Sequence, residues 1–349
     1  MDSKERFITA LYKKVPDRIP IFDFIFSQKI IEKSTGIYPN TYTSELAIKT
    51  AEILGHDGIW IPFGGYSGIS SVKDAYIDEW GTFYMKKSSV SWPIDAPFDY
   101  SIKSKRDLEK FTPPDPFIKE RLTEVNKAIK IVGNRIAVFG GIQGPFTTAF
   151  LMLGLENLCF WLIDNCDSVK KIFEMSNEFY MGAAKVMVRA GVDGIILAED
   201  LGYTGSLFIS PDMYNDVLFP YLHDLISFVK SLDVPVILHC DGSIQEVLEG
   251  LVDMGIDAYH PVEKKAGMDI LKVKKQFGDK ICLIGNIDLV NTLRLGTPSD
   301  VEKEVKELIE NVGPGGGYIV ASEHSLNDGI PFENVIAIKD AVIKFGCYY

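Results

Sequence analysis

The amino-acid sequence predicts a (β/α)8 barrel, that is, a TIM barrel with a β-hairpin and helices inserted between its second and third strands. Two observations lead to this prediction. Short β-branched or aliphatic runs recur along the chain, and the stretches between them mostly have helical periodicity. The runs are almost continuously apolar, as expected for parallel strands that are covered on both faces. The eight runs span residues 18–24, 57–64, 135–141, 192–200, 234–242, 256–263, 280–288 and 317–324.

The number of strand-then-helix units favours a closed barrel. Eight units in 349 residues fit one barrel domain over residues 1–349, and a doubly wound open sheet is the alternative. Residues 211–232 are expected to form a helix, with Ser210 as N-cap and Pro211 at the first helical position. A second clear helical pattern covers residues 298–313.

The spacing of the runs is uneven, because the whole of 65–134 separates the second strand from the third. Within it, residues 71–95 alternate in polarity around Trp80-Gly81. This pattern predicts a β-hairpin that caps one rim of the barrel and forms no second domain.

Composition excludes several classes of protein. A net charge of −12 without a basic block argues against nucleic-acid binding. No apolar stretch approaches the roughly 20 residues of a membrane span, and the N-terminal segment has no export signal, so we expect a cytoplasmic protein that does not bind membranes. Five cysteines without a C-x-x-C pair indicate free thiols.

Residues that can bind metal gather where the predicted strands end. In a parallel barrel the active site lies at the carboxyl ends of the strands, so these residues determine the chemistry. The last five runs end in Glu199 and Asp200, His239 and Asp241, His260 and Glu263, Asn286 and Asp288, and Glu323 and His324.

His239 and Asp241 are the pair best placed to share a metal ion. Side chains two apart on an extended strand point to the same face, while Cys240 between them points to the layer between strand and helix. Glu263 and His324 from nearby strand ends would complete a nitrogen and oxygen site compatible with zinc. The alternative is a hydrogen-bonded turn, since barrel mouths collect polar residues whatever they bind.

At these residues the sequence resembles the uroporphyrinogen decarboxylase superfamily, which includes corrinoid-dependent methyltransferases and, more distantly, cobalamin-independent methionine synthase. The resemblance covers the full chain and implies a (β/α)8 barrel with its site at the strand carboxyl ends. The matching segments are "DRIPIFDF" (17–24), "DEWGTFY" (78–84), "ISPDMYNDVLFPY" (209–221), "HCDG" (239–242), "LIGNID" (283–288) and "HSLNDGIPFENVIA" (324–337).

The sequence departs from two branches of this superfamily. Residues 23–33 lack the arginine-rich segment with which true decarboxylases hold a polycarboxylate substrate. Methyltransferases that deliver methyl groups to thiols bind zinc through a His-x-Cys pair, a carboxylate and a distant Cys. His239 and Glu263 fit that pattern, but Asp241 and His324 stand near the positions of the two thiolates. Such ligands leave more positive charge on zinc, which favours activation of an ether oxygen.

The resemblance and these replacements together predict a methyltransferase of the O-demethylase type. It would move a methyl group from an O-methyl donor, a methoxylated aromatic, to the Co(I) corrinoid of a partner protein, with zinc as the Lewis acid. Three alternatives stay open: methyl transfer from a methyl-corrinoid to a thiol or folate, a decarboxylase, and a scaffold for the corrinoid protein. The oligomeric state is also open, with a homodimer as the candidate assembly.

Further site residues follow from this hypothesis. Glu199, Asp200 or Tyr203 would orient the donor or protonate the leaving oxygen, and only one of the adjacent carboxylates can point inward. Gly141, Gly285 and Asn286 would let the backbone approach the cofactor, for which a tight turn is the simpler explanation. The walls of the donor pocket would be Phe22, Phe24, Trp60, Phe63 and Tyr203, for each of which ordinary barrel core is the alternative.

Overall fold

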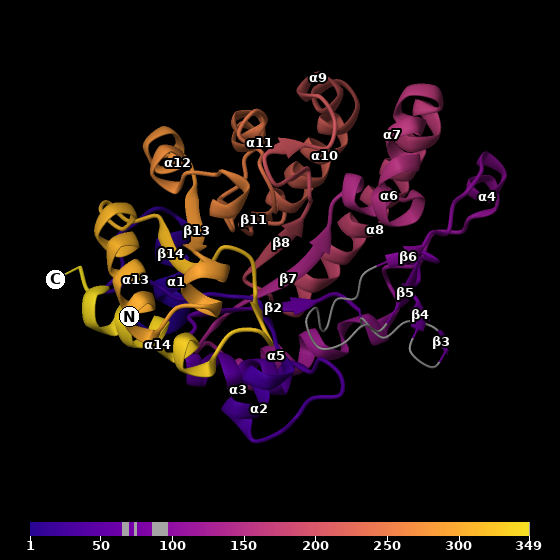
Figure 1. Ribbon diagram of the computed structural model, residues 1–349. Helices are drawn as coiled ribbons and strands as arrows, with labels where there is room; N and C mark the ends of the chain where they lie inside the picture. Colours follow the sequence, from indigo (N-terminus) through magenta and orange to yellow (C-terminus); the bar gives the residue numbers. More distant parts are fainter. Residues whose placement is uncertain (65–69, 73–74, 86–96, 349) are drawn as a thin grey trace.

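The computed structural model describes residues 1–64, 70–72, 75–85 and 97–348, and its centre is a parallel sheet that curls into a barrel (Figure 1). Seven strands lie in the order β14-β13-β12-β11-β8-β7-β2, and every neighbouring pair is parallel. They are β2 (Gly58–Pro62), β7 (Ala137–Gln143), β8 (Gly194–Ala198), β11 (Val236–His239), β12 (Ala258–His260), β13 (Cys282–Ile287) and β14 (Tyr318–Ser322).

Residues 18–24 close the barrel between β14 and β2. Ile21 forms a parallel bridge with Val320, and the N–H of Asp57 donates to the Ile21 carbonyl at 2.8 Å. The segment is not a continuous strand because Pro20 has no N–H and because the Asp57 carboxylate accepts the N–H of Ile21 at 2.9 Å. Eight segments therefore surround the core, as the sequence predicts. Just beyond this segment, β1 (Ile25–Phe26) pairs with β15 (Leu326–Asn327).

Helices cover the outside of the barrel, and α1 closes its amino-terminal end, where Phe7 enters the aromatic core. The helices are α1 (Ser3–Leu11), α2 (Gln28–Thr35), α3 (Ser44–Leu54), α4 (Lys105–Lys110), α5 (Thr123–Val132), α6 (Pro145–Leu153), α7 (Leu155–Asp164), α8 (Cys166–Ala190), α9 (Pro211–Met213), α10 (Phe219–Lys230), α11 (Leu248–Asp253), α12 (Ile270–Phe277), α13 (Pro298–Val312) and α14 (Phe332–Phe345). Short turns are 3₁₀ helices at Lys119–Leu122 and Lys264–Ala266 and π-helical turns at Tyr214–Leu218 and Leu289–Arg294.

Both helical patterns singled out in the sequence form helices. The Ser210 hydroxyl caps α9 by accepting the N–H of Met213, and a π-helical turn joins α9 to α10. Thr297 begins α13 with a capping box. Within the described part of the chain, no single helix has the length and apolar composition of a membrane span, although α6 and α7 would meet both criteria as a pair bent by 107°.

The insertion after β2 is a small antiparallel sheet. Its strands are β3 (Ser70–Val72), β4 (Ala75–Ile77), β5 (Phe83–Met85) and β6 (Pro97–Asp99). The expected hairpin is β4–β5, with its turn at Trp80-Gly81, whereas residues 73–74 and 86–95 of the predicted stretch lie outside the described residues.

This insertion is fixed to the barrel by its turn. The Asp78 carboxylate accepts the N–H groups of Trp80 and Thr82 at 2.9 and 2.8 Å. The Trp80 ring packs against Phe179 and Tyr180 of α8, with ring centroids 5.3 and 6.2 Å away. The matched segment at 78–84 therefore packs against the outside of the barrel.

Candidate metal centre at the mouth of the barrel

Three potential ligands converge at the carboxyl ends of β8 and β11. β11 ends at His239, and Asp241 follows two residues later on the same face. The Asp241 N–H donates to Asp200 at 3.1 Å, which brings the end of the neighbouring strand into the cluster. Ligand atoms of Asp200, His239 and Asp241 lie within 4.8 Å of one another. The expected pair is thus joined by Asp200, which was expected to orient the donor or protonate the leaving oxygen.

His324 reaches this cluster from the end of β14. Its Nε2 lies 3.1 Å from Asp241 Oδ2, while His239 Nε2 lies 3.6 Å from the same oxygen. Burial acts to lower the pKa of His324, but the hydrogen bond to Asp241 and its charge outweigh this effect and raise the pKa to about 9. The His324 side chain is 47% exposed, so the cluster is open to solvent on this side.

The two carboxylates of the cluster shift in opposite directions. Burial raises the pKa of Asp200, and the negative charge of Asp241 raises it further. Burial acts to raise the pKa of Asp241 as well, but the neighbouring charge of His239 and the hydrogen bond from His324 hold it below its usual range. Asp241 is therefore the fixed negative charge on which the histidines converge.

The cluster has the properties of a metal site. Asp241 Oδ1 is buried and has no hydrogen-bond partner among the described residues, which is costly for a carboxylate oxygen unless a cation or donor meets it. The donor types suit zinc, which binds imidazole nitrogen and carboxylate oxygen at about 2.0–2.2 Å. Asp200, His239 and Asp241 could hold such an ion, with His324 beside them.

Gly242 and Glu263 hold the loop that carries Asp241. The Gly242 N–H donates to Glu263 Oε2 at 2.7 Å, so one oxygen of Glu263 is already engaged. Gly242 has φ +86°, and a Cβ there would lie 2.4 Å from the carbonyl carbon of Gly202. Glycine is thus required after Asp241. The structure places Glu263, which the sequence predicts as a ligand, in contact with this loop and outside the group of three.

Glu199 points away from the cluster. Its two carboxylate oxygens accept the N–H groups of Phe146 and Thr147, at 2.8 and 2.9 Å, in the first turn of α6. The side chain is fully buried, and this burial raises its pKa to about 8. Of the adjacent carboxylates 199 and 200, the first joins β8 to α6 and the second faces the cluster.

Aromatic rings pack beside the histidines. Phe24 meets the His239 ring edge-to-face with centroids 5.1 Å apart, stacks on Phe26 at 5.4 Å and contacts Trp60 at 5.5 Å. With Asp23 and other residues these rings line a hollow of about 20 Å³, which has room for about one water molecule. Phe24 and Trp60, two of the expected wall residues, therefore lie together beside His239.

The other expected wall residues have different surroundings. Phe22 is fully buried in the core beneath Phe24. Phe63 packs against Phe179 and the Arg121 guanidinium, near the insertion. Tyr203 is 52% exposed and stacks on Phe208.

His260 lies beside this cluster; it ends a predicted strand, but the sequence-based hypothesis assigns it no role. β11 and β12 are in parallel register with His239 opposite His260, and the two Nδ1 atoms are 2.8 Å apart. Burial lowers the pKa of His260 well below its usual value, and the charge of His239 lowers it further. The signal that could have identified it is that two successive predicted strands both end in histidine.

Comparison with known proteins then places the chain in a family. The model of the uroporphyrinogen decarboxylase (URO-D) family matches residues 94–345. The chain belongs to the uroporphyrinogen decarboxylase family. Its relatives include the methylcobamide:CoM methyltransferase MtaA of Methanosarcina barkeri, 26% identical over 349 residues, which cover 97% of this chain and 96% of that protein.

Other members of the uroporphyrinogen decarboxylase family are similarly distant. The methylcobamide:CoM methyltransferase MtbA of Methanosarcina mazei is 26% identical over 88% of both chains. The uroporphyrinogen decarboxylase of Chlorobium phaeovibrioides is 25% identical over 95% of this chain and 92% of that protein. A solved methyltransferase from Methanosarcina mazei shares the fold, with TM-score 0.77 and 22% identity over 99% of both chains. The predicted barrel and superfamily are confirmed, and the methylcobamide-dependent relatives agree with the predicted corrinoid-dependent branch.

In this uroporphyrinogen decarboxylase family member, the glycines proposed for cofactor contact lie against protein groups. A Cβ on Gly141 would fall 2.1 Å from Trp60 Nε1, and one on Gly285 would fall 1.9 Å from the Pro261 carbonyl oxygen. The amide of Asn286 donates to the Val262 carbonyl. Close packing between neighbouring strands accounts for both glycines.

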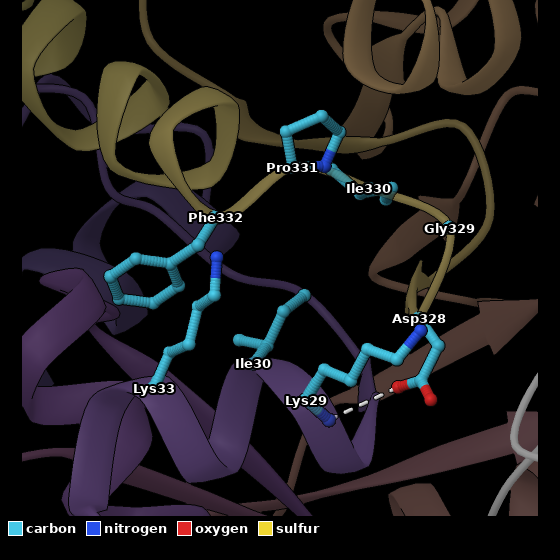
Figure 2. A pocket seen from close by; sticks show the side chains of 8 residues that line it. All are labelled: Lys29, Ile30, Lys33, Asp328, Gly329, Ile330, Pro331 and Phe332. Carbon is cyan, nitrogen blue, oxygen red and sulfur yellow. Dashed lines mark hydrogen bonds between the residues drawn. The ribbon is translucent and has the colours of Figure 1, made fainter.

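A separate hollow of about 280 Å³ lies outside the cluster, between α2 and the loop before α14 (Figure 2). Figure 2 shows Lys29 and Lys33 on α2, with Asp328 on the facing loop and Phe332 at the start of α14. The Lys29 N–H donates to Asp328 Oδ1 at 3.1 Å. The two lysines of the 23–33 stretch thus line this hollow, which shares no residue with the metal cluster.

Proposed function

We propose that this protein transfers the methyl group of an O-methyl donor, a methoxylated aromatic, to the Co(I) corrinoid of a partner protein. The observation that carries the proposal is a cluster of carboxylates and imidazoles without a thiolate. Cys240, the cysteine next to the cluster, is fully buried in the outer hydrophobic layer, and its Sγ accepts the N–H of Leu201 at 3.4 Å. The methylcobamide-dependent relatives support a corrinoid reaction.

His239, Asp241 and Asp200 are the residues that would hold zinc, with His324 able to join them from the solvent side. When bound, zinc would supply Lewis acidity to the ether oxygen of the donor. The chain supplies two negative charges and neutral imidazole nitrogen, so the bound ion keeps more of its positive charge than among thiolates. That is the property that activation of oxygen requires.

The proposed reaction is a nucleophilic displacement at the methyl carbon. The methyl–oxygen bond breaks, its electron pair stays on the oxygen, and the pair held by Co(I) forms the new methyl–cobalt bond. The departing alkoxide or phenolate must be stabilised where its charge develops. Asp200 belongs to the proposed ligand set. Glu199 is given no role in the reaction, because both its carboxylate oxygens accept N–H groups of α6.

The aromatic rings beside His239 suit the proposed donor. Phe24, Phe26 and Trp60 contact one another with centroids 5.4–5.5 Å apart. The hollow beneath them is too small for an aromatic ring, so the donor would lie above them at the open mouth, next to His324. We leave Phe63 and Tyr203 out of this pocket because their rings pack elsewhere. The stretch that carries arginines in decarboxylases here contributes Lys29 and Lys33 to a different hollow.

The direct test mixes the zinc-loaded protein with a Co(I) corrinoid protein and a panel of methoxylated aromatics, and follows cobalt methylation by absorbance. We expect methylation that depends on both donor and protein and is lost in Asp241→Ala. Asp224→Ala is the matched control, because that aspartate side chain is 72% exposed. If no methoxylated aromatic alkylates the cobalt, the proposal fails.

A second candidate function is methyl transfer in the opposite direction, from a methyl-corrinoid to a thiol. The names of the relatives MtaA and MtbA, methylcobamide:CoM methyltransferases, favour it. It predicts that methylcobamide is consumed when a thiol is added, without any methoxylated aromatic. Running both reactions on one preparation separates the two candidates.

A further inference from the structure

Two histidines at the end of neighbouring strands share one hydrogen bond. His239 Nδ1 and His260 Nδ1 are 2.8 Å apart, and the ring centroids are 5.0 Å apart. At this distance one nitrogen donates a proton and the other accepts it. A neutral imidazole carries a single N–H, so this bond also decides which nitrogen of His239 has a free lone pair.

The surroundings of His239 make the two arrangements chemically different. If His260 donates, His239 carries its own proton on Nε2, which faces Asp241 Oδ2 at 3.6 Å. If His239 donates, its Nε2 presents a lone pair toward that carboxylate, which is unfavourable unless a cation lies between them. The first arrangement suits a metal-free cluster, and the second suits a bound metal ion.

The fold holds His260 in place for this bond. It is 1% exposed, and its ring packs edge-to-face against Phe22 and Phe24, with centroids 5.9 and 5.1 Å away. Its Nε2 has no hydrogen-bond partner among the described residues. Among the described residues, the hydrogen bond of this buried imidazole is therefore the one to His239.

We propose that His260 is a positioning residue that accepts the Nδ1 proton of His239 and so directs the Nε2 lone pair of His239 to the metal. This inference rests on the metal centre of the proposed function and adds a residue outside its ligand set. Metal-binding histidines generally donate their second ring N–H to an acceptor that fixes the tautomer. A second imidazole would fill that role here.

Two substitutions of nearly equal size isolate the acceptor. His260→Asn places an amide oxygen close to the position of the Nδ1 atom, whereas His260→Leu places a methyl group there. We expect zinc affinity, measured by competition with a chromophoric chelator, to fall about 10–100-fold in His260→Leu and much less in His260→Asn. Far-UV circular dichroism and the thermal midpoint check that each variant is folded.

Nitrogen NMR on the wild-type protein gives a readout that needs no variant. With only five histidines in the chain, selective ¹⁵N labelling resolves each ring. In the zinc-loaded protein we expect His239 to carry its proton on Nδ1 and to bind metal through Nε2. Two results would overturn the role of His260 and leave the metal centre standing. One is metal bound through Nδ1 of His239, and the other is a folded His260→Leu variant that binds zinc as tightly as the wild type. A wild-type protein that binds no zinc would overturn the metal centre itself.

Discussion

Glu199 and Asp200 are adjacent carboxylates to which the structure gives opposite roles, so exchanging each for its amide should have opposite effects. Glu199→Gln should lower stability and leave zinc affinity and methyl transfer within about twofold of the wild type. Asp200→Asn should weaken zinc binding with little effect on stability. The reason is that Glu199 accepts two N–H groups of α6, whereas Asp200 faces the cluster.

The expected loss of stability follows from the buried contacts. Glu199 is fully buried, and its oxygens accept N–H groups at 2.8 and 2.9 Å. An amide keeps one acceptor and turns its NH2 group toward the second N–H, and an unsatisfied buried group of this kind costs about 1–3 kcal/mol. Unfolding entropy of about 2.1 cal/mol/K per residue makes a loss of about 2 kcal/mol equivalent to roughly 3 °C in a chain of this length.

Differential scanning calorimetry and chelator competition on the same preparations measure both effects. A Glu199→Gln variant with an unchanged melting temperature and a tenfold or greater loss of methyl transfer would refute the structural role of Glu199. It would also restore the acid–base role that the sequence alone allows for this residue.

Three further predictions concern other parts of the molecule. Burial lowers the pKa of His56 to about 3, so folding favours the neutral imidazole, and the stability that this residue contributes is present above pH 6.5 and lost as pH falls. In urea unfolding, the wild type should therefore lose about 2 kcal/mol more stability than His56→Gln between pH 7 and pH 5. Equal losses in the two proteins would contradict this prediction. Gly242→Ala should cost about 1–3 kcal/mol of stability and weaken zinc binding, because Gly242 has φ +86° and a Cβ would displace the loop that carries Asp241. Chemical denaturation measures the stability, and chelator competition measures the zinc affinity. Unchanged values would show that the loop tolerates a side chain. Trp60→Leu should raise KM for the methoxylated donor about tenfold with unchanged zinc affinity, and an unaltered KM in steady-state kinetics would remove Trp60 from the pocket.

Much of the barrel could be predicted from local sequence, because apolar runs and helical periodicity are properties of short segments. All eight runs occupy barrel positions, although residues 18–24 do so without forming a continuous strand. Pro20 lacks an N–H, and the Asp57 side chain replaces part of the backbone pairing. That exchange depends on a residue far along the chain, so the sequence of the segment could not reveal it.

The candidate site was predictable only where a single strand sets the geometry. His239 and Asp241 share a face because side chains alternate along one strand. The direction of Glu199 depends on the position of the α6 N-terminus, and the role of His260 depends on the register between β11 and β12. Both are tertiary relationships between segments, which a single sequence does not specify.

X-ray absorption at the zinc edge of the loaded protein reports the atoms that bind the metal. We expect bound zinc with only nitrogen and oxygen neighbours at about 2.0–2.2 Å, and we expect Asp241→Ala to abolish this spectrum. A zinc–sulfur distance of about 2.3 Å, or a protein that retains no zinc, would contradict a metal centre built from Asp200, His239 and Asp241.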